Sequence, residues 1–353
     1  MSYHGLAGLA NIGNTCYANA VIQALRVIPE WSALMERNDV ISEDADTTSR
    51  KIFLAYQDIA RTLWSKEAVR GAICRPMAFW RDVREAVTGT VYESFREPRP
   101  QDAHEFLVYL LDQCNEALKV KTEDPLFKSL GGFKSPVTDL LFGWDKVECI
   151  CGVCGASSVR YEPFNMLKVG LNNQITDPAA LFAADRLDEE LDGYACEKCA
   201  PVRTKATIKR SLWHLPKTLF YVLRRFTPDG RKDNTAFHYE GESITFTDHF
   251  AEDAPGLRNA VYRPIASIDH MGMASGGHYV AQVYHPLLHK WFMFDDERSQ
   301  EQSGPKYSVM TYIIVFSAAQ PMASAAQPMA SAAAAPAATR ATEEDGTQEA
   351  GNN

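Results

Sequence analysis

Four of the eight cysteines form two short pairs, and this pattern restricts the fold more than any other feature of the chain. The first pair is Cys151-x2-Cys154, and the second is Cys196-x2-Cys199. Tetrahedral Zn²⁺ prefers such a set of four thiolates, so we expect the two pairs to meet around one metal ion. Residues 155–195 between the pairs exceed the usual gap of a compact zinc ribbon. The spacing therefore predicts strands that run out from the first pair and return to the second.

The expected zinc ion supports structure rather than chemistry, because four protein ligands leave no open coordination position. Cys149 is a spare thiol beside the first pair and competes with Cys151 as a ligand. The alternative is that the pairs are reduced thiols that hold no metal.

Features of the whole chain indicate an intracellular protein, cytoplasmic and/or nuclear. The first residues, MSYHGLAGLANIGNTC, lack the basic start and apolar run of a secretory signal. No apolar run approaches the ~18 residues that cross a bilayer, so we expect no membrane association. The cysteines are then expected as reduced thiols, metal ligands or a nucleophile rather than disulfides. The net charge of −9 comes without a basic stripe, which argues against a nucleic-acid partner.

Helical patterns come first along the chain and strand patterns follow, which favours an α+β fold. After Thr15, the stretch CYANAVIQALRVI has helical spacing, and Pro29 is expected to stop that helix. A second helix is expected to start near Pro100. From Leu215 onward the segments LPKTLFYVLRRF, HYVAQVY, WFMFDD and VMTYIIVF read as strands. Residues 318–353 contain a tandem AAQPMAS repeat and are predicted to be a disordered, low-complexity tail.

Cys16 is placed where a thiol can act as a nucleophile. The first turn of a helix carries partial positive charge and free N–H groups, which favour a thiolate and stabilise a negative charge nearby. Asn11 lies five residues earlier, and its amide is a candidate donor to an oxyanion. The alternative for Cys16 is a small buried apolar residue.

His278 is the candidate base, because it follows two glycines and opens the alternating strand HYVAQVY. If HPLLHK is a hairpin loop, Tyr284 faces Trp291 and His278 faces Glu297. Asp295 then lies one diagonal step from His278 on the same face and is the favoured orienting group.

Asp296 is the reserve for that role, since a slip of one residue would exchange the two aspartates. The alternative is that His278 is a turn histidine and that both aspartates are solvated at the end of a loop.

Four segments of the chain together resemble the motifs of the ubiquitin-specific proteases. GLANIGNTCYANAVIQAL resembles their cysteine box, and QDAHEFLVYLLD resembles their glutamine-aspartate helix. YACEKC with LPKTLFYVLRRF is similar to their second zinc knuckle and the following strand. SGGHYVAQVY with WFMFDD is similar to their histidine box. The motifs occur in the family's order over roughly residues 5–317.

This resemblance implies a papain-like fold made of a thumb (about 1–136), zinc-bearing fingers (about 137–210) and a palm (about 211–317). It implies a thiol hydrolase that cleaves after the C-terminal glycine of ubiquitin, with ubiquitin and ubiquitinated proteins as partners. The alternatives are a ubiquitin-binding module without catalysis and a protease for another ubiquitin-like modifier.

The resemblance also assigns roles to residues of this chain. It implies that Cys16 is the nucleophile, His278 the base, Asp295 the orienting residue and Asn11 the oxyanion donor. The residues that it places along the tail of the substrate are Gln101, Asp102, Gly276, Gly277 and Tyr279. The carboxylate of Asp102 suits arginines in that tail, although it also suits the first turn of a helix.

Overall fold

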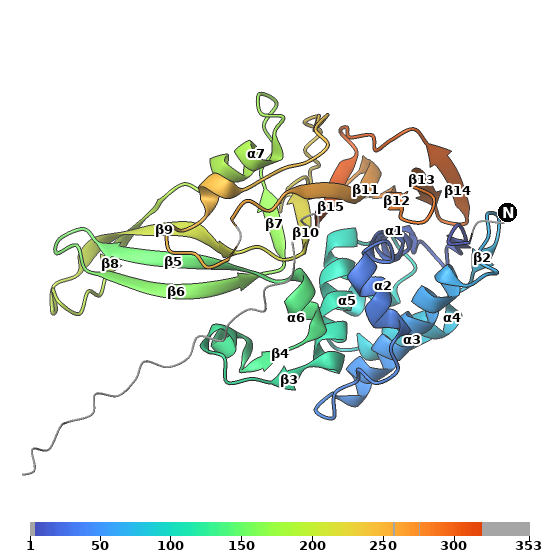
Figure 1. Ribbon diagram of the computed structural model, residues 1–353, viewed down its shortest axis with the longest axis horizontal. Helices are drawn as coiled ribbons and strands as arrows, with labels where there is room; N and C mark the ends of the chain where they lie inside the picture. The colour runs from blue at the N-terminus through green and yellow to red at the C-terminus, as the bar shows by residue number, and fades with distance from the viewer. Residues whose placement is uncertain (1–3, 257, 275, 320–353) are drawn as a thin grey trace, which may run out of the picture. The chain divides into compact units, whose positions relative to one another are not determined.

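Helices occupy the first part of the chain and strands the rest, as Figure 1 shows for the computed structural model. The structure describes residues 4–256, 258–274 and 276–319. The helices are α1 (Cys16–Leu25), α2 (Pro29–Glu36), α3 (Thr47–Trp64), α4 (Met77–Ala86), α5 (Ala103–Leu118), α6 (Pro136–Leu141) and α7 (Pro178–Ala184), with 3-10 turns η1 (Glu93–Arg96), η2 (Pro125–Leu130) and η3 (Thr247–His249).

Most of the strands form two separate sheets. The four-stranded sheet has the order β6-β5-β9-β8 and contains β5 (Gly143–Cys151), β6 (Ser157–Phe164), β8 (Glu189–Tyr194) and β9 (Thr204–His214). The seven-stranded sheet has the order β14-β13-β12-β11-β15-β10-β7 and contains β7 (Met166–Val169), β10 (Thr218–Leu223), β11 (Tyr262–Met273), β12 (Gly276–His285), β13 (Lys290–Asp295), β14 (Arg298–Gln302) and β15 (Thr311–Ala318).

Two small pairs of strands complete the fold. The short strands β1 (Gly8–Leu9) and β2 (Ile73–Cys74) pair in parallel, and β3 (Val120–Lys121) pairs with β4 (Phe133–Lys134) in antiparallel. Within the described residues, no helix is both long enough and apolar enough to cross a bilayer.

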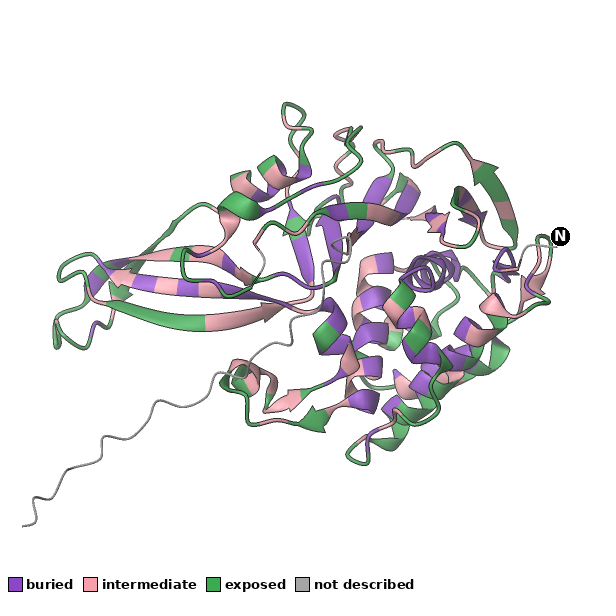
Figure 2. Ribbon diagram, in the orientation of Figure 1, coloured by how far each residue is buried: buried purple, intermediate pink, exposed green. Residues whose placement is uncertain are grey.

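The seven-stranded sheet is buried on both faces in its centre. All six residues of β10 are buried, and they alternate between two apolar cores. Phe220 and Val222 join the core beneath the helices, whereas Tyr221 and Leu223 join the core shared with α7. Figure 2 shows β10 in the colour of buried residues and much of β6 as exposed. The sheet is therefore the layer between two cores.

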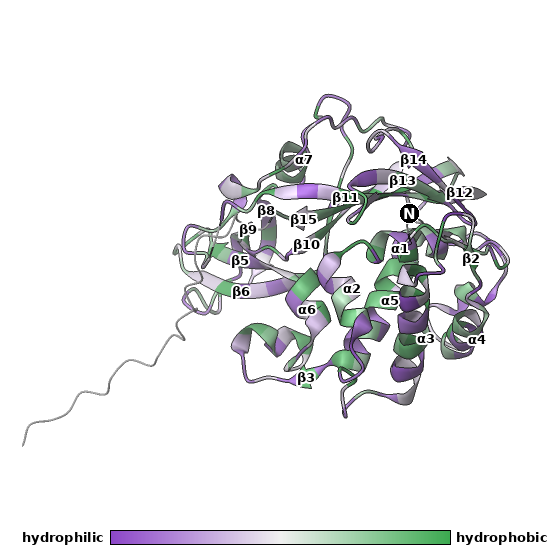
Figure 3. Ribbon diagram, turned by 45° about the vertical axis from the view of Figure 1, so that its right-hand side comes forward, coloured by the Kyte–Doolittle hydropathy of each residue, from purple (hydrophilic) through white to green (hydrophobic). Residues whose placement is uncertain are grey.

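Helix α1 is the most deeply placed helix, since all ten of its residues are buried. It packs against β12 and β11 of the seven-stranded sheet on one side and against α5 on another. Helix α3 instead alternates between hydrophobic and hydrophilic residues, as Figure 3 shows, and buries one face. Because α1 is buried against β12, Cys16 at its start lies near the strand that carries His278, the candidate base.

The two helix starts near prolines differ in part from the sequence expectation. Helix α1 ends at Leu25, and Pro29 does not stop it but begins α2 as its first residue. A proline suits that position because the first turn of a helix needs no N–H there. Helix α5 begins at Ala103, close to the predicted position, with Asp102 as its N-cap.

A segment at the start of the described chain runs between α1 and the turn that joins β13 to β14. The N–H of Leu9 donates to the carbonyl of Asp296 over 2.8 Å. A Cβ on Gly8 would stand 2.3 Å from the backbone carbon of Glu297, so only glycine fits at this crossing. This N-terminal segment, residues 5–10, thus holds the turn after β13.

The predicted regions compare with the sheets as follows. Helices α1–α5 lie within residues 1–136, and the four-stranded sheet falls mostly within residues 137–210. Strand β7 also lies in that second range but pairs with β10 in the seven-stranded sheet. The predicted tail lies outside the described residues apart from Ala318, which ends β15, and Ala319.

Candidate active site and metal centre

Cys16 is the first residue of α1, as expected, and is only 3% exposed. The preceding turn is tight, because Gly13 and Asn14 both have positive φ angles of 77° and 64°. The backbone N–H of Thr15 donates to Oδ1 of Asn11 over 2.9 Å, which closes the turn. The thiol is therefore held at the N-terminus of a helix by a locked loop.

His278 lies on β12 and bonds the predicted orienting residue. Its Nε2 is 2.6 Å from Oδ1 of Asp295, and both side chains are partly exposed. The pKa of His278 is raised from 6.5 to about 9, first by a hydrogen bond with Cys16 and further by Asp295. Because Asp295 occupies Nε2, Nδ1 is the ring nitrogen left for the sulfur. The three groups thus converge from distant positions in the sequence.

The hairpin register explains this convergence, and it also corrects one expectation. Tyr284 pairs with Trp291, as predicted, and the ladder continues to the pair of Ala281 with Phe294. The predicted pairing of His278 with Glu297 is wrong, because the chain leaves β12 before that point. A turn at Asp296, where φ is 46°, sends the chain back as β14.

Asp296 does not bond the imidazole but holds two asparagine side chains. Its Oδ2 accepts from Nδ2 of Asn11 over 2.8 Å, and its Oδ1 accepts from Nδ2 of Asn19 over 2.7 Å. Asn11 is exposed, whereas Asn19 is buried. The carboxylate of Asp296 therefore fixes the amide of Asn11 beside the helix that begins at Cys16.

The five predicted substrate-binding residues all line one cavity of about 330 Å³. They come from two places, the start of α5 and the beginning of β12, and are Gln101, Asp102, Gly276, Gly277 and Tyr279.

Gly277 leaves no room for a side chain in this cavity. A Cβ there would stand 2.2 Å from Nε2 of His270 and 2.4 Å from the carbonyl oxygen of Met271. At Gly276 a Cβ would meet nothing within 4 Å. Gly277 therefore packs directly against β11 at the wall of the cavity, where only glycine fits.

Asp102 has the capping role that the sequence predicted, and its pairing with arginines of a substrate tail stays a prediction. It caps α5 by accepting hydrogen bonds from the N–H groups of His104 and Glu105. The hydroxyl of Tyr312 also donates to both of its oxygens, over 3.1 and 3.0 Å. The same residue lines the cavity, so its charge faces whatever enters.

Sequence reasoning missed several residues of this site. His270 lies under Gly277, is 3% exposed, and leaves its Nδ1 without a partner among the described residues. Phe226 and Glu105 also line the cavity. His270 has Tyr279 as its cross-strand partner, so extending the β11–β12 pairing back from His278 could have found it.

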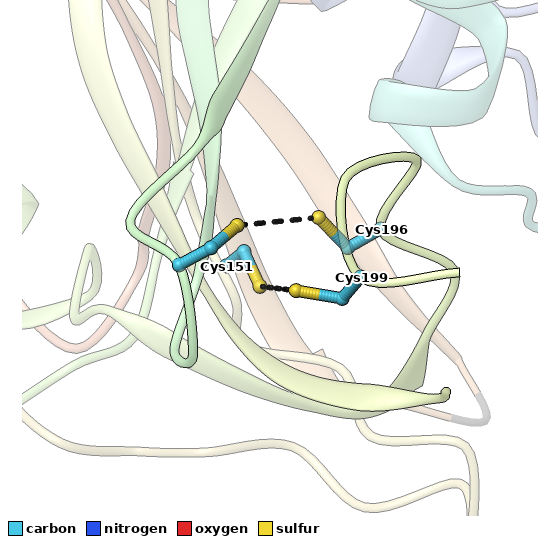
Figure 4. Close-up of side chains that lie close together, drawn as sticks. Cys151, Cys196 and Cys199 are labelled. Carbon is cyan, nitrogen blue, oxygen red and sulfur yellow. Dashed lines mark hydrogen bonds between the residues drawn. The ribbon is translucent and has the colours of Figure 1, made fainter. Parts of the chain in front are cut away.

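The four paired cysteines meet at the end of the four-stranded sheet, as Figure 4 shows. Their sulfur atoms all lie within 4.8 Å of one another, with Cys151 3.9 Å from Cys199 and Cys154 3.6 Å from Cys196. Zinc–sulfur bonds of about 2.3 Å in a tetrahedron place sulfurs about 3.8 Å apart, whereas a disulfide needs about 2 Å. The donor set therefore fits Zn²⁺ and does not fit disulfides.

The strands explain how two distant pairs come together. Cys151 ends β5, and Cys196 and Cys199 lie in the turn between β8 and β9. Strands β5 and β9 are antiparallel neighbours, with Cys151 opposite Ala206. The intervening strands thus run out and back, as the spacing predicted, and Cys149 does not belong to the sulfur cluster of the described residues.

The chain matches a family model described as "Ubiquitin carboxyl-terminal hydrolase" over residues 7–323. It is 30% identical over 316 residues to ubiquitin carboxyl-terminal hydrolase Usp2 of Drosophila melanogaster, with 83% of this chain and 32% of that protein covered. It is 26% identical over 334 residues to ubiquitin carboxyl-terminal hydrolase 3 of Homo sapiens, with 82% and 63% covered. The chain therefore spans less than two thirds of the length of either relative.

A solved structure confirms the α+β fold. The SAGA DUB module Ubp8/Sgf11/Sus1/Sgf73 bound to monoubiquitin is similar with a TM-score of 0.71 and 18% identity. The match covers 90% of this chain and 70% of that chain.

Proposed function

We propose, since this chain belongs to the ubiquitin carboxyl-terminal hydrolase family, that it is a thiol hydrolase that cleaves after the C-terminal glycine of ubiquitin. The bond cleaved is an isopeptide or peptide bond, and ubiquitinated proteins are the substrates. The observation that carries the proposal is the imidazole of His278, which bonds Asp295 at 2.6 Å and has hydrogen bonding with Cys16 as the main cause of its raised pKa. An intracellular location, cytoplasmic and/or nuclear, stays a prediction.

The proposed reaction is an acyl transfer in two steps. The thiolate of Cys16 attacks the carbonyl carbon of the terminal glycine, and the protonated His278 donates its proton to the leaving amine. His278 then takes a proton from water, which attacks the thioester and releases the carboxylate. Asp295 holds the ring by Nε2 throughout, so that the other nitrogen stays toward the sulfur.

The amide of Asn11 is the proposed side-chain donor to the oxyanion. It lies at the turn before Cys16, where the first N–H groups of α1 are also free of helical partners. Its Nδ2 donates to Asp296 in this structure, so Asp296 sets where the amide lies. We assign Asp296 a positioning role rather than contact with the imidazole.

The cavity at the start of α5 is the proposed binding site for the substrate tail. Asp102 supplies a carboxylate there for arginines of the tail, and Gly276 and Gly277 present backbone without side chains to the tail. The four cysteines are proposed to hold one Zn²⁺, which would stabilise the turns at the end of the four-stranded sheet. When bound, the ion supplies structure and no step of the reaction.

Two alternatives follow from the same geometry. A binding module without catalysis would leave the convergence of Cys16, His278 and Asp295 without a purpose. A protease for another ubiquitin-like modifier would use the same residues, and cleavage of several modifiers side by side would separate it from the proposal.

The experiment is to treat the protein with ubiquitin that carries a C-terminal electrophile and to measure hydrolysis of a ubiquitin conjugate. We expect labelling at Cys16 in the wild type and complete loss of both labelling and turnover in Cys16→Ala. Cys114→Ala is the matched control, since that thiol is also buried on a helix but lies outside the site. Hydrolysis retained in Cys16→Ala would disprove the proposed nucleophile.

A further inference from the structure

The cavity proposed for the substrate tail has three walls that come from separate parts of the chain. The start of α5 supplies one wall, the loop after β10 supplies the second, and the end of β11 with the start of β12 supplies the third. The loop contributes Phe226, Thr227 and Gly230 to the lining. Backbone hydrogen bonds such as Thr227 N–H to the carbonyl of Arg231 shape this loop from within, and side chains connect it to β11.

Lys232 joins the loop wall to the β11 wall. Its Nζ donates to the carbonyl of His270 over 2.6 Å and to that of Gly272 over 3.3 Å. Its own backbone pairs with Phe226 in an isolated bridge, so the side chain and main chain of one residue span both walls. The φ of 107° at Gly272 aims that carbonyl, which few other residues could do.

The ammonium group of Lys232 has carbonyl oxygens as its partners, and within the described residues it makes no ion pair with a carboxylate. Burial lowers the pKa of Lys232, and the nearby Arg225 lowers it further. A half-buried ammonium that bonds only backbone carbonyls forms no ion pair. Its contribution is to hold the backbone segments whose carbonyls it bonds.

The carbonyls that Lys232 holds belong to β11, which pairs with the start of β12 at one wall of the cavity. The ring of His270 stands under Gly277, and Gly272 pairs with Gly277 across the two strands. Met271, between the two held carbonyls, pairs with His278. A shift of this strand would therefore change the width of the cavity before it disturbed the remote helices.

We propose that Lys232 is a positioning residue for substrate binding, which fixes the width of the cavity by clamping the loop after β10 to the end of β11. It does not touch the reacting atoms. This inference rests on the proposed function for the identity of the substrate, while the clamp itself is a property of the two walls.

Steady-state kinetics with a fluorogenic ubiquitin substrate tests the proposal. In Lys232→Met we expect KM to rise about tenfold with kcat within about twofold, because the loss of charged donors loosens binding but leaves Cys16 and His278 in place. Lys232→Arg keeps the charge and the donors and should recover most of the lost affinity. Lys51→Met is the matched control, an exposed lysine of α3 that pairs with Glu85.

A second measurement does not depend on the substrate. Hydrogen exchange of the backbone amides at residues 270–273 should accelerate in Lys232→Met and not in Lys51→Met, with or without ubiquitin. If the wild type fails to cleave ubiquitin, the proposed function is lost, yet faster exchange would still support the clamp. An unchanged exchange rate together with an unchanged KM, or an Lys232→Arg variant as defective as Lys232→Met, would overturn it.

Discussion

At the scale of single residues, the site depends on how one imidazole is charged. His278 has a partner on each side, the sulfur of Cys16 and the carboxylate of Asp295, and both favour its protonated form. Burial acts in the opposite direction but does not outweigh them. The base is therefore set to carry a proton at neutral pH, which is the form that the leaving amine requires.

The pH dependence of the reaction follows from this charge. The pKa of His278 in the folded protein is about 9, so turnover should fall as pH rises through about 9. In Asp295→Ala that alkaline limb should move to lower pH, because one of the two favourable partners is gone. A pH–rate profile of both proteins checks the shift, with Asp58→Ala on the exposed face of α3 as control.

The same group contributes to stability with a defined sign. Because its pKa is raised above 6.5, the stabilisation is fully present below pH 6.5 and is lost as pH rises through about 9. An Asp295→Ala variant with an unmoved alkaline limb would contradict the assignment of Asp295.

At the scale of elements, α1 both presents Cys16, the proposed nucleophile, and holds the N-terminal segment. Asn19, Gln23 and Arg26 lie on one face of the helix end, and each donates to carbonyls of residues 5–10. All three side chains are buried, in a helix that is otherwise apolar. The three residues are spaced by four and then three positions, which places them on one side of a helix. Because buried polar groups need hydrogen-bond partners, such a row of polar residues in a buried helix indicates a neighbouring backbone segment.

Replacing Gln23 by Met should lower the free energy of unfolding by about 1–3 kcal/mol, because two buried polar groups lose their partner. Its Nε2 donates to the carbonyl of Ala7 over 3.2 Å, and its Oε1 accepts from Nε of Arg26 over 2.5 Å. Urea denaturation measures the loss. Lys51→Met should change stability by less than about 0.5 kcal/mol, and an equal effect in both variants would show that the stripe is not special.

Prediction from the sequence succeeded where alternation or spacing determines the outcome. The hairpin that pairs Tyr284 with Trp291 placed Asp295 beside His278. The position of Glu297 was wrong, because the left-handed turn at Asp296 depends on the N-terminal segment packed against it. Local sequence carries no record of such a contact.

Lys232 could not be predicted at all. Its partners are backbone carbonyls of a distant strand, and such groups exist at every position of a chain. By contrast, the start of α5 was close to its predicted place, since Asp102 caps it locally.

At the scale of the whole described unit, the cluster of four cysteines and Cys16 lie at separate places. The sulfur cluster is at the end of the four-stranded sheet that points away from α1 (Figure 1). Of the described residues of β6 and β8, only Phe164 at the end of β6 packs against an apolar core. The end of this sheet therefore has little apolar burial to keep it folded, which is the situation in which a metal ion contributes most.

Loss of the metal should lower hydrolysis of ubiquitin conjugates but leave the chemical reactivity of Cys16 nearly unchanged. We expect metal analysis to find one Zn²⁺ per chain in the wild type and none in Cys154→Ser, and hydrolysis of ubiquitin conjugates should fall in that variant. The rate at which iodoacetamide alkylates Cys16 should stay within about twofold of the wild-type rate. The reason is that the apolar core around α1 is distinct from the end of the four-stranded sheet. Cys149→Ser is the control and should keep the metal. A Cys154→Ser protein that retains zinc would contradict the ligand set.

The contact between the N-terminal segment and the turn after β13 has a consequence for folding during translation. Leu9 is synthesised well before its partner Asp296, which follows 287 positions later (296 minus 9). At about 5–20 residues per second, the two emerge roughly 15 to 60 s apart. Until then the nascent chain carries Cys16 but neither His278 nor Asp295, which converge on it in the folded chain. If the proposed function is correct, the nascent chain cannot hydrolyse ubiquitin conjugates until translation of the domain is almost finished.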